Sequence, residues 1–370
     1  MRKYDSVVQF CAKGTDASKK FVTMMEDYAK HDINDRMNTN FVVDTKYSKE
    51  DKAEKINVAY MSEIERRTRI KLEDYDGNIE DYANNPSVIQ MQTYLNKILL
   101  DTVTPILINA TNLSMLAEFH YGGYGDLYEF EMENDDLFEV SKMGRRQKHT
   151  KIQERKKQNK TISMDNYGLS VMTTLPKIFL GESMLAKDIM LMALSMNQKI
   201  YSVVVNKFIE ETEKITDPRF VVTNYAEKPL MDKLRTGSAW NGGAKMTIVG
   251  DALALKDLLP ELNNIRVLLT DSYNTSLGFM AQWNGYDVIG FDVTKDPTTE
   301  NGILGLPTDR IYGLSLNGAG KLIHVGIGKT LANTDNAMDN DNFAIASTYS
   351  KELGAELATN KKVVKCTLAE

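Results

Sequence analysis

Few residues in this sequence have the types and spacing that binding or catalytic chemistry requires. Residues 326–330 (GIGKT) end like a phosphate-binding loop, in which backbone amides wrap the phosphates and a lysine neutralises them. That loop needs a glycine five residues before Gly328, and Ile323 occupies the position, so the motif is incomplete. Residues 122–125 (GGYG) do not complete a dinucleotide-binding fingerprint, and a hinge is the better interpretation.

Other catalytic and metal-binding patterns are missing from the sequence. It contains neither a Gly-x-Ser-x-Gly elbow nor a His-Glu-x-x-His pair. The histidines at positions 31, 120, 149 and 324 are scattered without metal-ligand spacing, and His324 lies in an apolar run typical of a hydrogen-bonded core histidine. We therefore expect no catalytic residues, no cofactor and no metal, and predict that the protein is not an enzyme.

Composition and charge exclude several classes of protein. The 370 residues carry a net charge of −6, so the whole molecule would be repelled by nucleic acid and acidic membranes, and any such contact must be local. Two cysteines, Cys11 and Cys366, cannot form a disulfide framework, which indicates a reducing compartment. No signal peptide and no apolar run of membrane-spanning length is present, so we expect synthesis in the cytosol without membrane insertion.

Charge is strongly polarised in the middle of the chain. Residues 126–139 contain seven acids and no base, and Tyr128, Phe130 and Met132 alternate with glutamates as in a half-exposed strand. Residues 142–160 contain nine basic residues and one acid, and a second alternating stretch follows at 169–175. This pattern predicts a long two-stranded excursion with an acidic leg and a basic tip. Because an isolated two-stranded ribbon is only marginally stable in water, something outside it must supply contacts.

The basic tip has three interpretations. It binds nucleic acid phosphates, meets an acidic partner surface, or is a solvated loop. Residues 142–160 contain no aromatic side chain for stacking on bases, and the acidic leg offers a complement on a neighbouring copy. Self-association is therefore favoured over nucleic-acid binding.

The distribution of glycine predicts the remaining organisation. Only Gly14 and Gly77 lie in the first 120 residues, so this third should be helical and the rest richer in strands and turns. We expect helices from Asp16, over 51–71, and from Pro86 until Pro105 ends or kinks it. These elements are too polar for a core of their own, so we expect them to pack on other surfaces of the protein. A long helix is predicted over 183–214. Beyond it we expect strands at 247–249, 266–270, 286–293, 310–316, 321–327 and 361–368, a helix capped by Asp251, and a helix over 342–358.

In this order the elements resemble the major capsid proteins of tailed bacteriophages, the Hong Kong 97-type fold. The most similar pieces are residues 174–179 (TLPKIF) before the long helix, 247–250 (TIVG), 341–343 (DNF) and 361–365 (KKVVK). The resemblance covers residues 121–370 and implies an α+β class. The implied domains are an N-terminal helical arm (1–120), an extended β-ribbon loop (121–182), a peripheral domain with a spine helix (183–239), an axial domain (240–320) and a closing peripheral segment (321–370).

The resemblance implies a structural protein that assembles from pentamers and hexamers into an icosahedral virion capsid around double-stranded DNA, in the host bacterial cytoplasm. Its implied partners are other copies of itself, scaffold and portal proteins, and packaged DNA held by non-specific contact. No asparagine follows Phe343 in the region where some relatives form a lysine–asparagine cross-link, so we expect a non-covalent shell. Intersubunit salt bridges are expected between acids and bases of the loop: Glu129, Glu131 and Glu133 with Arg145, Arg146, Lys148, Arg155, Lys156 and Lys157.

Two alternatives remain open at this point. One is an encapsulin-like nanocompartment shell, which has the same fold and encloses a cargo enzyme. The other is a monomeric nucleic-acid-binding protein that uses the basic 142–160 loop.

Overall fold

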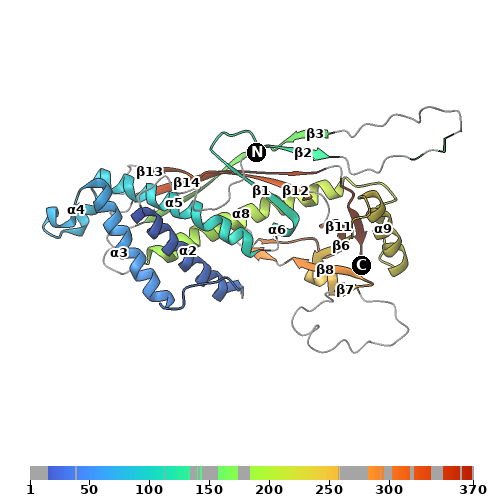
Figure 1. Cartoon of the computed structure of the whole chain (residues 1–370), viewed down its shortest axis with the longest axis horizontal. Helices are drawn as coiled ribbons and strands as arrows, with labels where there is room; N and C mark the ends of the chain where they lie inside the picture. The colour runs from blue at the N-terminus through green and yellow to red at the C-terminus, as the bar shows by residue number, and fades with distance from the viewer. Residues whose placement is uncertain are drawn as a thin grey trace.

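The computed structural model of the chain is elongated, with a helical end and a sheet-rich end (Figure 1). Helices α2 to α5 occupy one end, strands β6, β7, β8 and β11 with helix α9 occupy the other, and helix α8 runs between them. The structure describes residues 16–37, 40–111, 113–133, 140, 142–143, 157–173, 184–256, 258, 282–291, 293–295, 302–316, 321–334, 345–358 and 361–368.

The first third of the described chain is helical, as its scarcity of glycine predicts. Ser48 caps α3 through a capping box with Asp51, and Asn85 caps α5, where Pro86 stands in the first turn. Pro105 does not end α5, which continues to Ala110. The elements are α2 (Asp16–Met37), α3 (Lys49–Thr68), η1 (Leu72–Tyr75), α4 (Ile79–Ala83), α5 (Pro86–Ala110) and α6 (Leu113–Leu116).

The long helix α8 spans Leu185–Glu213, close to the predicted 183–214, and is about 43 Å long at 1.5 Å per residue. Its N-terminal half shares one core with α2, α3 and α5. Phe21, Met25 and Tyr28 recur three or four residues apart on α2 and are buried in that core. The helices expected to form an arm therefore pack against α8. They bury their few apolar side chains in a core that they share with it.

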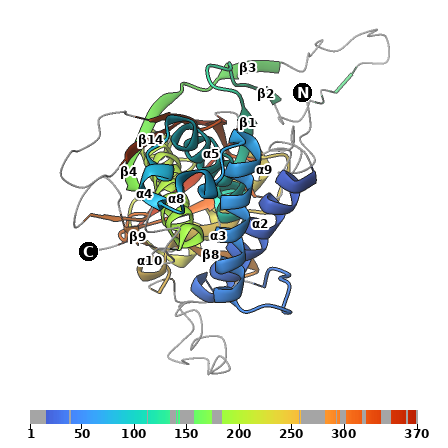
Figure 2. The same ribbon diagram turned by 90° about the vertical axis from the view of Figure 1, so that its left-hand side faces the viewer.

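A five-stranded sheet covers this helical layer. Strand β14 (Ile345–Leu357) lies at its centre and pairs with β4 (Asp165–Thr173) on one edge. On its other edge it pairs with β12 (Ile323–Gly328) and then with β13 (Leu331–Thr334). Strand β1 (Ala117–Gly122) adds to β12 in parallel. The end view in Figure 2 shows the helices α5 and α8 gathered beneath β14, with the strands β2 and β3 above.

The predicted helix over 342–358 is wrong, because residues 345–357 form the strand β14. The apolar residues Tyr349, Leu353 and Leu357 recur every four positions, which favours a helix, yet burial also alternates along 347–357 as in a strand. Pairing along both edges decides between the two patterns. The expectation of a non-covalent shell treated the residues after Phe343 as part of a helix. Because residues 345–357 form a strand, this segment no longer supports that expectation.

The far end of the molecule carries a six-stranded sheet in the order β5-β15-β11-β6-β8-β7. Helix α9 (Glu227–Trp240) packs on β5 and β15, and Asp251 accepts a hydrogen bond from the Leu253 amide at the start of α10 (Ala252–Lys256), as predicted. The predicted strand over 266–270 lies outside the described residues. The strands are β5 (Val221–Val222), β6 (Thr247–Asp251), β7 (Gln282–Trp283), β8 (Tyr286–Phe291), β11 (Arg310–Leu314) and β15 (Val364–Thr367), with β9 (Thr294–Lys295) and β10 (Ile303–Leu304) forming a separate pair.

The two-stranded ribbon consists of β2 (Glu129–Glu133) and β3 (Lys157–Thr161). The predicted acidic strand is confirmed, but the partner predicted at 169–175 is wrong, since that stretch belongs to β4 and pairs with β14. The true partner is the C-terminal end of the predicted basic tip. Its sequence KQNKT has no apolar alternation, so only the backbone pairing reveals it.

Candidate assembly interface

The β2–β3 ribbon lies on the face of the five-stranded sheet opposite α8. Tyr128, Phe130 and Met132 point inward and are buried with Ile162 and Ala358 in a small cluster of their own. The Tyr128 hydroxyl donates a hydrogen bond of 3.1 Å to the Ile327 carbonyl of β12. The alternation in the sequence therefore corresponds to one face that holds the ribbon against the sheet.

Glycines in the sheet make room for the ribbon. A Cβ atom added at Gly326 would lie 2.7 Å from the Met164 sulfur, and one added at Gly122 would lie 2.8 Å from the Tyr128 hydroxyl oxygen. Such separations are far below van der Waals contact, so a side chain at either position would force Met164 or Tyr128 to shift. The Gly-Ile-Gly pattern at 326–328 thus serves close packing on strand β12 and is not a phosphate-binding loop.

The outward side of the ribbon is charged. Glu129 and Glu131 are exposed on β2, and the Glu131 carboxylate lies 2.7 Å from the Lys157 ammonium across the ribbon. Both partners of this pair are about half exposed, so it contributes at most about 1 kcal/mol to stability. Part of the acid–base complementarity expected between subunits is thus met within one chain.

The other loop residues expected at an intersubunit contact are placed only in part. The backbone of Glu133 ends strand β2, while its side chain is not described. Arg145, Arg146, Lys148, Arg155 and Lys156 lie outside the described residues.

His324 is the buried, hydrogen-bonded histidine that its position in an apolar run predicts. Its Nδ1 lies 3.1 Å from His120 Nε2, and its ring stacks on Phe130 with centroids 3.8 Å apart. Burial lowers the pKa of His324 to about 4, assisted by the neighbouring His120 and Lys361. Burial also lowers the pKa of His120, against the opposing charge of Glu118. The sequence offers one local sign of this group, since Glu118 and His120 stand two residues apart and so share one face of a strand, but nothing in it links them to His324.

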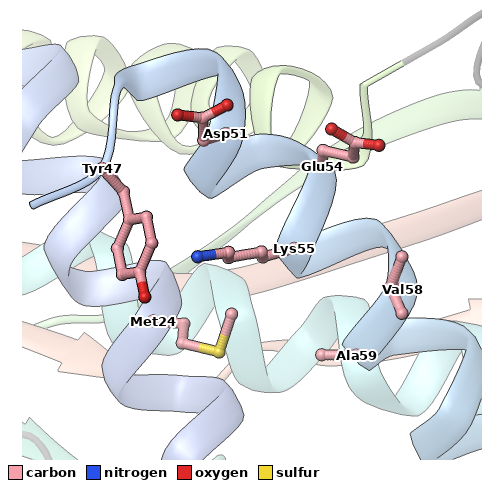
Figure 3. A pocket seen from close by; sticks show the side chains of 7 residues that line it. All are labelled: Met24, Tyr47, Asp51, Glu54, Lys55, Val58 and Ala59. Carbon is pink, nitrogen blue, oxygen red and sulfur yellow. The ribbon is translucent and has the colours of Figure 1, made fainter.

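An open pocket of about 650 Å³ lies between α2 and α3 at the helical end (Figure 3). The ammonium of Lys55 points over the ring of Tyr47, and Met24 lies below them. The remaining lining residues are Asp51, Glu54, Val58 and Ala59. Lys55 is thereby occupied by an aromatic contact, and no histidine, cysteine or serine lines the pocket, so its lining offers no nucleophile with an adjacent base.

Large apolar side chains are exposed on several separate elements. They include Val42 (92% exposed), Leu127 (73%), Leu253 (65%) and Val58 (64%). These residues lie before α3, before β2, on α10 and on α3. Single exposed apolar side chains of this kind are ordinary on a protein surface.

Comparisons with known proteins give similarity at the level of the fold. No family model matches the chain, and no curated protein matches it significantly. Within the described part of the chain, no helix has the length and apolarity needed to cross a membrane.

Several solved structures follow a similar chain path. The capsid of the native GTA particle matches with a TM-score of 0.48 and 12% identity, covering 70% of this chain and 90% of that one. Gordonia phage Cozz gives a TM-score of 0.44 and 13% identity, with coverage of 70% and 87%. The satellite phage P4 procapsid gives a TM-score of 0.41 and 8% identity, with coverage of 72% and 100%. These similarities, all at TM-scores below 0.5 and at 8 to 13% identity, are to phage and GTA capsid structures.

Proposed function

We propose that the chain is the major capsid protein of a tailed bacteriophage, and that it assembles from pentamers and hexamers into an icosahedral shell around double-stranded DNA. The observation that carries this proposal is the β2–β3 ribbon, which is held to its own subunit on one face only. Its other face presents Glu129, Glu131 and Lys157, and within the described residues its two strands pair with nothing but each other. The charged, solvent-facing side of the ribbon is thus available for contact with a neighbouring subunit.

The arrangement of the remaining elements supports the same function. A rigid helix of 29 residues joins a helical end to a second sheet, which gives the subunit the length to reach neighbours on different sides. Repeated heterologous contacts of this kind close into rings and shells when symmetry permits. In this proposal residues 240–320 form the axial domain at the centre of each ring, and residues 183–239 and 321–370 form the peripheral domain.

The charged loop sets how neighbouring subunits align. We assign Arg145, Arg146, Lys148, Arg155 and Lys156 to salt bridges with acids of an adjacent subunit, among them Glu129 and Glu133. Each exposed pair contributes about 0 to 1 kcal/mol, so the pairs select register more than they add strength. Replacing Arg145, Arg146 and Lys148 together by glutamine should make assembly less sensitive to salt, whereas unchanged salt sensitivity would remove these residues from the interface.

The first experiment is sedimentation of the purified full chain at low and high salt, with negative-stain electron microscopy of each fraction. Closed particles or rings of five or six copies support the shell. A monomer that persists at all protein and salt concentrations, and also after co-expression with neighbouring phage genes, contradicts it. The proposed assembly takes place in the host cytoplasm and includes scaffold and portal proteins. Co-expression with neighbouring phage genes is meant to supply these two partners.

An encapsulin-like nanocompartment shell is an alternative with the same fold. The contents of the particles distinguish it from a phage capsid. A nanocompartment shell would enclose a protein cargo, and a phage capsid encloses DNA. Nuclease treatment of purified particles followed by DNA extraction, together with mass spectrometry of co-purifying proteins, distinguishes the two.

A further inference from the structure

Three side chains with metal-binding atoms meet where strands β1 and β12 pair in parallel. Glu118 and His120 lie two residues apart on one face of β1, and Glu118 stands opposite His324 in the register of the pair. This face looks toward the β2–β3 ribbon, whereas Ile323 and Val325 of β12 point into the core around α8. The three side chains therefore come from segments about 200 residues apart and lie directly beneath the base of the ribbon.

The ligand atoms of the three side chains are already close together. His120 Nε2 lies 3.1 Å from His324 Nδ1, the nearest Glu118 oxygen lies 3.7 Å from the same Nδ1, and one ligand atom from each residue lies within 4.8 Å of the others. The two imidazole rings are nearly parallel, and their centroids are 5.4 Å apart, which means that the rings meet edge to edge through these nitrogens. Without a metal, this contact is an N–H···N hydrogen bond.

The same separation suits two ligands of one metal ion. In a tetrahedral zinc site with Zn–N bonds of about 2.0 to 2.1 Å, two ligating nitrogens lie roughly 3.3 Å apart. A modest tilt of each ring toward Glu118 aims both lone pairs at a common point, and the half-exposed Glu118 side chain can move in to supply an oxygen. We propose that Glu118, His120 and His324 bind a divalent transition-metal ion of the zinc class, with a fourth position left for water.

Neutral imidazole is the form that binds metal, and both rings lie beneath the ribbon, His324 buried and His120 partly buried. Phe130 lies flat on one face of the His324 ring. Lys361 is the opposing positive charge near His324, and the Glu118 carboxylate offsets it.

A bound ion would join β1 to β12 at the point where the ribbon is anchored. It would replace a single side-chain hydrogen bond by three coordinate bonds, in addition to the backbone pairing and core packing that already join the two strands. This site is independent of the proposed function, because metal binding by the full chain can be measured whether or not the chain assembles.

The test is calorimetric titration of the tag-free, EDTA-treated full chain with ZnCl₂, in a Cys11→Ser background that removes a competing thiolate. One Zn²⁺ per chain is expected, together with a rise in Tm, and Co²⁺ should give the intense visible bands of a tetrahedral site. His120→Gln should abolish stoichiometric binding, and Glu118→Gln should weaken it at least tenfold. His31→Gln removes a histidine from α2, far from the cluster in the fold, and should leave the affinity unchanged.

Several outcomes would overturn the proposal. These are the absence of a saturable site in the parent chain, or an affinity that is the same in His120→Gln as in the parent. Equal weakening by His31→Gln would point to adventitious binding by surface histidines. Glu118 is half exposed, so Glu118→Gln should fold normally and keeps the test valid if His120→Gln does not fold; circular dichroism of each variant verifies this.

Discussion

The ammonium of Lys351 lies 3.1 Å from the carboxylate of Asp101, and both side chains are almost fully buried. Lys351 belongs to β14 and Asp101 to α5, so the pair joins the central strand to the helical layer. The same Asp101 oxygen accepts hydrogen bonds from the Thr330 amide at 3.1 Å and its hydroxyl at 2.6 Å. Thr330 lies between β12 and β13. Here three residues, 328–330, lie opposite two residues of β14, 351–352, and this extra residue makes a β-bulge.

Removal of Lys351 should strongly destabilise the fold. Lys351→Ala leaves Asp101 buried with no cation, which costs about 3 to 5 kcal/mol, measured by chemical denaturation of the unassembled chain. Lys245→Ala is the matched control, because Lys245 pairs with Asp287 at 2.8 Å on the surface and its loss should cost no more than about 1 kcal/mol. Equal losses for the two variants would contradict this account of the buried pair.

Gly354 should tolerate no side chain. A Cβ atom there would overlap the Ser163 carbonyl oxygen in the segment that joins β3 to β4, so Gly354→Ala should cost roughly 1 to 3 kcal/mol or displace that segment. Gly168 is the control on the facing strand β4, since its nearest neighbours lie 4.0 Å from an added Cβ. Comparison of the two denaturation midpoints checks the prediction, and a Gly354→Ala variant as stable as Gly168→Ala would refute it.

Phe130 should hold the ribbon to the sheet. Phe130→Ala removes a buried ring stacked on His324, which lowers the free energy of ribbon opening by about 3 kcal/mol and speeds amide exchange there by roughly a hundredfold. Hydrogen exchange read by mass spectrometry should localise the change to 129–133 and 157–161. Leu127→Ala, at an exposed position three residues earlier, should leave exchange unchanged; faster exchange throughout the sheet would mean that Phe130 supports the whole fold instead.

Cys366 should be unreactive in the native chain. Burial raises the pKa of its thiol to about 12, so the reactive thiolate is scarce at neutral pH. In a Cys11→Ser variant, the alkylation rate should keep rising with pH beyond the ordinary thiol pKa of about 8.5. A rate that levels off near that value would show an ordinary thiol, and the denatured chain provides that reference curve.

Leu253 should contribute to assembly without contributing to folding. Its side chain is 65% exposed on α10, so Leu253→Asp should change the free energy of unfolding by less than about 0.5 kcal/mol. In the proposed shell, α10 belongs to the axial domain, and a charge there should prevent ring formation in sedimentation. Normal rings from this variant would remove Leu253 from the subunit contacts.

The sequence predicts elements with strong local periodicity and fails where long-range pairing decides. The helices from Asp16 and over 183–214 and the strand around Phe130 follow from spacing alone. The segment 342–358 fits both helical and strand periods, and only pairing on two edges makes it β14. The meeting of Glu118 with His324 depends on a parallel pair that no local pattern signals.

The central position of β14 also orders events during synthesis. Strand β1 pairs with β12, whose residues lie about 200 positions later, and within the described residues β4 pairs with β14 alone. On the ribosome the ribbon therefore has no sheet to rest on until β12 and β14 have emerged, because folding with such distant pairings waits for the later partner. A nascent chain that has not reached β14 cannot offer its ribbon in the final position to a neighbour.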